Sequence, residues 1–339
     1  MNIDIVIIGR NTEKTLPECI ESILNSDYPD GDLSILYVDS GSSDRSCQIA
    51  SSYDGVTVLE LSEGYPSPGA GRNIGWKAGS APLIQFLDSD TVLAPQWLST
   101  AAEAMGNDIG AVRGNRTERF PEKSIFNWIA DQEWNAPPGD CDSFGGDVLV
   151  RRSVLESTGG YNETLVGGED PELSRRICEK NWRIVQLDEP MTTHDMNMHT
   201  IRDYWKRSFR TGYGYAAVVS IRAAKGDCFW RPELRRIVFR GCAGPLLIAI
   251  GLLGATFLSL GFLVAALAGL ALIFSPRLRS VTSLRKEKAL EVRDARIYAW
   301  HCSFHVIPGF LGALRFWIGS IFNRPLRNSR YPLRAENCS

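Results

Sequence analysis

Residues 243–274 form an uncharged, almost wholly apolar stretch, and this feature limits what the chain can fold into more than any other. As one helix, at ~1.5 Å per residue, it would be roughly 50 Å long, whereas the hydrocarbon core of a bilayer is ~30 Å thick. Ser259, Leu260 and Gly261, near its middle, can form a turn. We therefore expect a transmembrane hairpin of two short spans, with a re-entrant pair as the alternative.

Basic residues flank this stretch on both sides. They are Arg231, Arg235, Arg236 and Arg240 before it, and Arg277, Arg279, Arg285, Lys286 and Lys288 after it. Because Lys and Arg favour the cytoplasmic side of a membrane, both flanks are expected on the cytoplasmic face of the cell (inner) membrane. A second apolar region, 304–322, contains Pro308 and Arg315. We expect an in-plane interfacial helix there, with a third span as the alternative.

The first part of the chain alternates between short apolar runs and amphipathic runs. The runs at 4–9, 33–38, 56–61 and 83–87 have the composition of buried strands, whereas 15–25 has apolar residues at helical spacing. This alternation predicts an α/β fold built on a largely parallel sheet. In such sheets, ligands bind at the carboxyl ends of the strands.

Two carboxylates follow the apolar run 83–87 directly. Asp88 and Asp90 are two residues apart, so in extended backbone they point to the same side. Carboxylates that close repel each other unless a cation lies between them, and Mg²⁺ or Mn²⁺ favours such oxygen ligands. The alternative is a strand that ends in an Asx-type turn.

Polar residues at other strand ends extend this candidate site. Asn11 and Asp39 follow the first two predicted strands, and an Asp39 carboxylate can accept a hydrogen bond from a nucleotide base or ribose. The alternative is a polar turn in which Asp44 caps the next helix. The glycine-bearing stretch 69–79 opens a helix, where Arg72 can bind a phosphate or a base carbonyl. Its spacing matches neither a dinucleotide fingerprint nor a P-loop.

A third acidic motif opens a predicted helix. In Gly168-Glu169-Asp170-Pro171, the proline suits the first helical position, which makes Asp170 the N-cap. Capping would lower the pKa of Asp170 and keep it ionised, as a general base for a sugar hydroxyl requires. His194 is a candidate metal or phosphate ligand, with a structural role as the alternative, and His199 is a weaker candidate.

Composition removes other classes of protein. A formal net charge of -2 argues against a dedicated nucleic-acid binder. The 8 cysteines have neither a Cys-x-x-Cys pair nor zinc-site spacing, which indicates reduced thiols. The aromatic residues of 123–134 are interpreted as core packing, with sugar stacking as the alternative.

Five motifs now stand in a specific order. They are Asp39-x-Gly-Ser-x-Asp44, Gly71-Arg72-Asn73-x-Gly75, Asp88-x-Asp90, Gly159-Gly160-Tyr161-Asn162-Glu163 and Gly168-Glu169-Asp170-x-Glu-Leu173. In this order they resemble the family 2 glycosyltransferases with the GT-A fold, a Rossmann-like mixed sheet flanked by helices. The resemblance covers the first two-thirds of the chain.

The resemblance implies a nucleotide-sugar donor, most often a UDP-sugar, and inversion at the anomeric carbon. It implies that Asp39 contacts the base, that Asp88 lies near the ribose and the metal, and that Asp90 binds the metal. It assigns the role of catalytic base to Asp170. Processive synthases of the family carry Gln-x-x-Arg-Trp, which is absent from 204–214. Single-sugar transfer is therefore favoured.

Arg207 and Arg210, in that same stretch, can hold the donor diphosphate. The sequence predicts a GT-A catalytic domain over 1–235 and a membrane-associated region over 236–330. The predicted enzyme transfers a sugar to a hydroxyl of a lipid-linked or exported glycan acceptor. The alternatives are a nucleotidyltransferase that makes a nucleotide sugar, and a non-catalytic assembly subunit that binds one.

Overall fold

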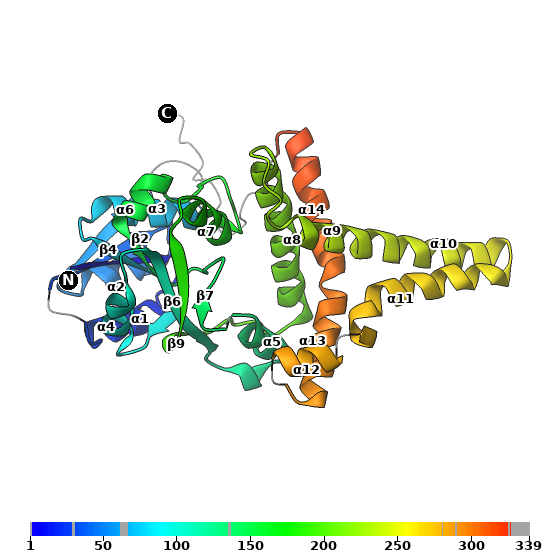
Figure 1. Ribbon diagram of the computed structural model, residues 1–339, viewed down its shortest axis with the longest axis horizontal. Coiled ribbons are helices and arrows are strands. Elements are labelled where there is room, and N and C mark those ends of the chain that lie inside the picture. The colour runs from blue at the N-terminus through cyan, green and yellow to red at the C-terminus, as the bar shows by residue number, and fades with distance from the viewer. Residues whose placement is uncertain are drawn as a thin grey trace. The chain divides into compact units, whose positions relative to one another are not determined.

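The structure is a computed structural model that describes residues 2–28, 31–61, 67–134, 137–279, 281–288, 290–324 and 326. Its chain forms two compact units, Met1–Asn197 and Met198–Leu326. Figure 1 shows an α/β fold for the first unit and helices for the second. The predicted domain boundary at residue 235 stays a prediction, because the compact units divide earlier in the chain.

The first unit is built on a mixed sheet whose strands run in the order β3-β2-β1-β4-β8-β6-β9-β5, with β7 beside β9. Its elements are β1 (Ile3–Gly9), α1 (Leu16–Leu24), β2 (Leu33–Asp39), α2 (Ser46–Ser51), β3 (Val56–Glu60), α3 (Pro68–Ala78), β4 (Leu83–Asp88), β5 (Thr91–Leu93), α4 (Trp97–Ala104), β6 (Ile109–Glu118), η1 (Pro121–Lys123), α5 (Ile125–Trp134), β7 (Gly139–Asp140), β8 (Val148–Arg151), α6 (Arg152–Thr158), α7 (Glu169–Glu179) and β9 (Arg183–His194). Strands β1 to β4 are mutually parallel, whereas β8 is antiparallel to β4 and β6. The expected α/β class is confirmed.

The register of the parallel strands sets the edge at which polar side chains gather. Gly9 of β1 pairs with Asp39 of β2, and Ile8 pairs with Asp88 of β4. The carboxyl ends of β2 and β4 therefore lie on either side of the end of β1, at one edge of the sheet.

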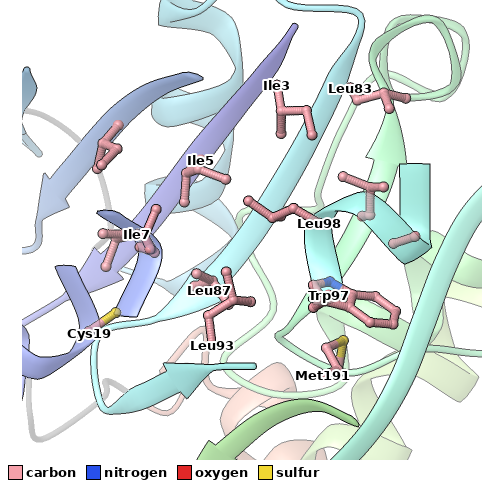
Figure 2. Close-up of a cluster of buried hydrophobic side chains, with 14 of the residues drawn as sticks. Ile3, Ile5, Ile7, Cys19, Leu83, Leu87, Leu93, Trp97, Leu98 and Met191 are labelled. Atoms are coloured by element: carbon pink, nitrogen blue, oxygen red, sulfur yellow. The ribbon is translucent and has the colours of Figure 1, made fainter. Parts of the chain in front are cut away.

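Both faces of the sheet are covered, which explains why its strands are continuous apolar runs rather than alternating ones. Ile3, Ile5 and Ile7 of β1 face one core, with Trp97 and Leu98 of α4, as Figure 2 shows. The intervening residues of β1 face a second core, which contains residues of α3, α6 and α7.

The second unit is helical. Its elements are α8 (Ile201–Ala223), α9 (Arg231–Val238), η2 (Phe239–Ala243), α10 (Gly244–Phe257), η3 (Leu260–Phe262), α11 (Leu263–Arg279), α12 (Val281–Glu287), α13 (Val292–Phe304) and α14 (Val306–Ile321). Helices α10 and α11 form an antiparallel hairpin, drawn in yellow in Figure 1. The chain reverses between Phe257 and Leu263, around the expected turn.

Among the residues that the structure describes, three stretches are long and apolar enough to cross a membrane, by length and composition: Arg231–Phe257, Leu260–Lys286 and Val292–Ile321. The third includes most of the region expected to be an interfacial helix, so its length and composition fit the alternative of a third span. Helix α14 in this stretch packs closely on α8. The distance is so short that a Cβ added to Gly212 would lie 1.9 Å from the Gly309 carbonyl oxygen. The interfacial position stays a prediction.

One hydrogen bond inside the first core offers a test of the packing. The Trp97 indole donates from Nε1 to Gln85 Oε1 at 2.8 Å, and both side chains are almost fully buried. Trp97→Phe should lower the free energy of unfolding by about 1–3 kcal/mol, because it leaves the buried Gln85 oxygen without this donor. Thermal unfolding in detergent measures the loss. Trp97→Phe combined with Gln85→Leu removes both partners and should lose less than the sum of the two single variants; strict additivity would contradict a coupling between them.

Candidate functional site

Strand β4 carries Asp88 to the edge of the sheet and ends there. The chain then turns through Ser89 and Asp90, and Thr91 Oγ1 donates to the Asp88 carbonyl oxygen at 2.7 Å. The expectation that Asp88 and Asp90 share one extended backbone was wrong, because this turn intervenes. The observed backbone matches the alternative of a strand that ends in a turn, yet both carboxylates remain at the edge.

The Arg72 guanidinium brings three carboxylates together. Arg72 lies on α3 and is 2% exposed. Its Nη2 is 3.0 Å from Asp88 Oδ1, and its Nη1 is 3.3 Å from both Glu169 Oε1 and Asp170 Oδ1. Two predicted site residues from opposite halves of the unit, Asp88 and Asp170, thus contact one cation.

A second arginine, Arg116 of β6, holds the other side of Asp88. Its Nη2 is 3.6 Å from Asp88 Oδ2, and its Nη1 is 3.4 Å from Asp147 Oδ2. Asp147 is buried and accepts hydrogen bonds from the Asp88 backbone N–H at 3.1 Å and from Thr192 Oγ1 at 2.8 Å. Burial raises the pKa of Asp147, with further repulsion from Asp88 and opposition from Arg116.

Arg116, Asp147 and Glu169 had no predicted role. Asp147 follows the pair Gly145-Gly146, and Glu169 precedes Asp170. The spacing of these motifs does not indicate a chemical role for either residue. Arg116 stands in a strand without any motif. Only the pairing of β6 with β8 and β9 reveals that it reaches the site.

Asp90 and His194 face each other at the far end of this cluster. Thr91 pairs with His194 in the ladder between β5 and β9, which places His194 Nε2 3.3 Å from Asp90 Oδ1. Partial desolvation of the half-exposed carboxylate would raise the pKa of Asp90, but the His194 hydrogen bond and the Arg116 charge outweigh it and lower that pKa. The Trp134 ring lies edge-on to the His194 ring, with centroids 5.4 Å apart, and 5.0 Å from the Arg116 guanidinium carbon. Trp134 therefore borders the site rather than a core alone.

Two predictions for Asp170, that it is the N-cap of its helix and that its pKa is lowered, differ from the structure. The N-cap of α7 is Gly168, in the left-handed region at φ 86°, and Asp170 lies within the first turn of the helix. Burial raises the pKa of Asp170 to about 8 despite the opposing charge of Arg72, and Glu169 and Asp88 add repulsion. The predicted lowering was wrong because the carboxylate is buried among other acids and does not cap the helix.

Asp39 and Asn11 shape the neighbouring loops. Asp39 accepts four hydrogen bonds, from the backbone N–H groups of Gly41 and Ser42, the Ser42 hydroxyl and the Tyr37 hydroxyl. Asn11 Oδ1 accepts from the Ser43 backbone N–H at 2.8 Å. The polar-turn alternative describes this arrangement, and contact of Asp39 with a nucleotide base stays a prediction.

The remaining predictions for the site concern Asp44 and two arginines. Asp44 does not cap α2, whose N-cap is Arg45; it accepts hydrogen bonds from Ser46 and from the Glu13 backbone N–H instead. Arg207 and Arg210 lie on α8, in the second unit. Their role in binding a diphosphate stays a prediction.

Sequence comparison identifies the class to which this fold and this cluster belong. The profile described as Glycosyl transferase family 2 matches residues 4–146, and the profile described as Glycosyl transferase family group 2 matches residues 83–284. The chain belongs to the family 2 glycosyltransferases, and it is an enzyme of that class with the GT-A fold.

Particular relatives are distant. Glycosyltransferase AglE of Haloferax volcanii is 24% identical over 67% of this chain and 79% of its own. The beta-monoglucosyldiacylglycerol synthase of Trichormus variabilis is 26% identical over 56% of this chain, which spans only 43% of that relative.

Among solved structures, the mannosyltransferase PcManGT from Pyrobaculum calidifontis, in complex with GDP-Man and Mn²⁺, has a TM-score of 0.61 at 18% identity. The alignment covers 92% of this chain and 86% of that one. S. aureus TarS 1-349 in complex with UDP-GlcNAc has a TM-score of 0.51 at 16% identity, over 88% of this chain and 91% of its own. At such identities these likenesses show the fold alone.

The raised pKa of Asp170 predicts how stability depends on pH. An Asp with a folded-state pKa of about 8 binds its proton more tightly in the folded chain than in the unfolded chain, where the pKa is ~3.9. Stability should therefore fall as pH rises from ~4 to 8. Asp170→Asn cannot ionise and escapes this loss. The Tm of the variant minus the Tm of the native protein should therefore increase by several degrees between pH 5 and pH 9.

Thermal unfolding in detergent across this pH range checks that expectation. Glu103→Gln, which neutralises an exposed carboxylate on α4, is the matched control and should track the native protein. A constant Tm difference between Asp170→Asn and the native protein across the whole range would show that Asp170 is already ionised at pH 5.

Proposed function

We propose that this glycosyltransferase moves one sugar from a nucleoside-diphosphate donor, with inversion and with Mg²⁺ or Mn²⁺, to a hydroxyl of a lipid-linked or exported glycan acceptor. A UDP-sugar is the proposed donor. The neighbours TarS 1-349 and PcManGT were solved with UDP-GlcNAc and with GDP-Man and Mn²⁺, which supports a nucleotide sugar and a divalent ion in this class.

The observation that carries the proposal is the sharing of Arg72 by Asp88 and Asp170. Inverting transfer needs the leaving diphosphate on one side of the anomeric carbon and a base on the other, in line with it. Asp88 belongs to the carboxylates at the strand end, and Asp170 belongs to a helix start. Their contact with one guanidinium supports the proposal that both groups act on one bound donor.

The donor set fits a hard divalent cation. Asp90 is 42% exposed, His194 Nε2 lies 3.3 Å from it, and Asp88 is on the same edge. The acidic groups of the cluster outnumber its arginines, Arg72 and Arg116, so an added cation would be attracted to it. These acidic groups are Asp88, Asp90, Asp147, Glu169 and Asp170. Within the described residues, no three Asp, Glu, His or Cys side chains already converge as a complete metal site. Asp90 and His194, assisted by Asp88, would hold the ion together with diphosphate oxygens, a sharing that Mg²⁺ favours.

When bound, such a cation neutralises the charge that develops on the leaving diphosphate. The chain's own residues supply the rest of the chemistry. Arg72 and Arg116 are fixed donors beside Asp88 and can orient phosphate oxygens, because guanidinium groups pair with phosphate through parallel N–H bonds. Asn11 and Asp39 would bind the nucleoside from the neighbouring loops. Arg207 and Arg210 are proposed as further diphosphate ligands.

Asp170 is the proposed base that takes the proton of the acceptor hydroxyl. With its pKa raised to about 8, this carboxylate is a much stronger proton acceptor than an exposed one. Its contact with Arg72 fixes the direction of the carboxylate and favours its ionised form. Its position in the first turn of α7 aligns it with the positive end of the helix, which adds to that effect.

Membrane attachment follows from the three apolar stretches, and we propose that the catalytic unit works on the cytoplasmic face of the cell membrane. The basic residues at both ends of the α10–α11 hairpin support this orientation. Beta-monoglucosyldiacylglycerol synthase, by its name, makes a glucosylated diacylglycerol, which supports a lipid acceptor.

The proposed metal ligands can be tested by direct binding of Mn²⁺, measured by the loss of the free-ion signal in electron paramagnetic resonance. Asp90→Ala should abolish saturable binding in the presence of UDP. His194→Gln should weaken it at least about tenfold, as loss of an orienting or coordinating group does. Glu156→Gln, an exposed carboxylate on α6, is the control and should bind normally. Native affinity in Asp90→Ala would rule out this site.

The proposed base can be tested by kinetics. Asp170→Asn should lower kcat about 10²- to 10⁴-fold while the Kd for the UDP-sugar stays within about threefold, because the amide cannot accept the proton but keeps the shape of the carboxylate. Glu169→Gln is the matched variant, since Glu169 shares Arg72 without the proposed role, and it should lose far less activity. Near-native turnover by Asp170→Asn would assign the base to another group.

A further inference from the structure

The root of the α10–α11 hairpin is fixed by one buried arginine. Arg240 lies in the π-helical turn η2, where α10 begins, and its Nε donates to the Leu272 carbonyl oxygen at 3.3 Å. Pro276 of α11 has no N–H to offer that carbonyl, so Arg240 and the Ser275 hydroxyl donate to it instead. A further bond, to the Cys302 carbonyl oxygen at 3.2 Å, ties the root to α13. The first helix of the hairpin thus begins where the second one ends.

The opposite end of the hairpin is apolar and uncovered. Phe257 is 77% exposed, and Leu258 and Leu260 are each 75% exposed. An exposed apolar surface of this kind is stable in a bilayer and not in water. Because both helices return to one root, that root lies at a single membrane surface when the tip is inserted.

Positive charge gathers at this root from both directions along the chain. Exposed Arg235 and Arg236 of α9 precede the hairpin, and exposed Arg285 and Lys286 of α12 follow it. Helix α12 packs on α13, which also contacts α11, so α12 is held at the root (Figure 1).

A pocket of about 420 Å³ opens beside α12 and is lined by Thr282, Arg285, Lys286 and Leu290. Two exposed cations and one exposed hydroxyl can bind phosphate oxygens there, while the leucine offers a contact for an apolar chain. Cations at the level of the headgroups attract anionic lipids, by about a fivefold gain in affinity for each basic residue.

We propose that this pocket binds the phosphodiester headgroup of an anionic bilayer lipid, which selects the membrane surface at which the hairpin root settles. The inference rests on the insertion of the hairpin proposed above, and it adds a ligand site separate from the sugar-transfer residues. The bilayer is the favoured source of the phosphate because Thr282, Arg285 and Lys286 lie in the last turns of a candidate membrane span, Leu260–Lys286.

The test uses the purified full chain in a neutral detergent and follows its Tm. Dihexanoyl phosphatidylglycerol should raise the Tm by a few degrees, because a ligand that binds only the folded state stabilises it. Dihexanoyl phosphatidylcholine and inorganic phosphate should leave it nearly unchanged. An equal rise with phosphatidylcholine would show that charge is not recognised, and an equal rise with inorganic phosphate would make this a free-phosphate site; either result overturns the proposal.

Variants locate the response. Arg285→Ala with Lys286→Ala should weaken the apparent affinity for phosphatidylglycerol about thirtyfold, as expected for two lost cations. Arg285→Lys with Lys286→Arg keeps both charges and should keep the response, which guards against a misfolded alanine variant. Lys77→Ala with Lys180→Ala removes the same charge from the catalytic unit and should respond as the native chain does. An unaltered response in the Arg285 and Lys286 alanine variant refutes the site. Asp90→Ala should respond normally whether or not the proposed sugar transfer is correct, so the two proposals fail separately.

Discussion

The meeting of three acids at the candidate site depends on one shared guanidinium. Arg72 is almost entirely buried and contacts Asp88 from one part of the chain and the adjacent Glu169 and Asp170 from another. Without its charge, these carboxylates would repel one another in a poorly solvated space. The parallel strands bring Asp88 to the edge, α7 brings the other two acids, and the guanidinium allows them to meet. The cost of that crowding remains visible in the raised pKa of Asp170.

Local sequence pattern predicted the parts of the site that lie at strand ends. The apolar runs located β1, β2 and β4, and their parallel pairing placed Asp39 and Asp88 at one edge, because the carboxyl ends of parallel strands share it. Asp90 and His194 were predicted as candidate ligands of one metal, but their direct contact was not, since it requires the antiparallel pairing of two strands far apart in the chain. Arg116 was missed because its own strand carries no motif, and it reaches the site only through the pairing of β6 with β9.

Charge states were harder to predict than positions. The sequence around Asp170 has the composition of a capped helix start, and capping lowers the pKa of a carboxylate. The chain enters the helix two residues earlier, through Gly168, so Asp170 is enclosed by other acids instead. A pKa depends on burial and on every neighbouring charge. The charges near Asp170 are Arg72 of α3, Asp88 of β4 and Asp147 just before β8, and a local sequence pattern does not contain them. Membrane-crossing stretches, by contrast, follow from composition, and three such stretches are present in the described chain.

The bonds of Arg240 have a consequence for how the hairpin enters a bilayer. The carbonyl groups that satisfy this guanidinium belong to α11 and α13, which are synthesised after α10. Before α11 and α13 are in place, the Arg240 guanidinium just ahead of α10 lacks these acceptors at the root of the hairpin, and a buried charge without partners is costly. Because Pro276 donates no backbone N–H, the Leu272 carbonyl oxygen can accept from Arg240 as well as from the Ser275 hydroxyl. The two helices are therefore suited to enter a bilayer as a preassembled pair, not one after the other.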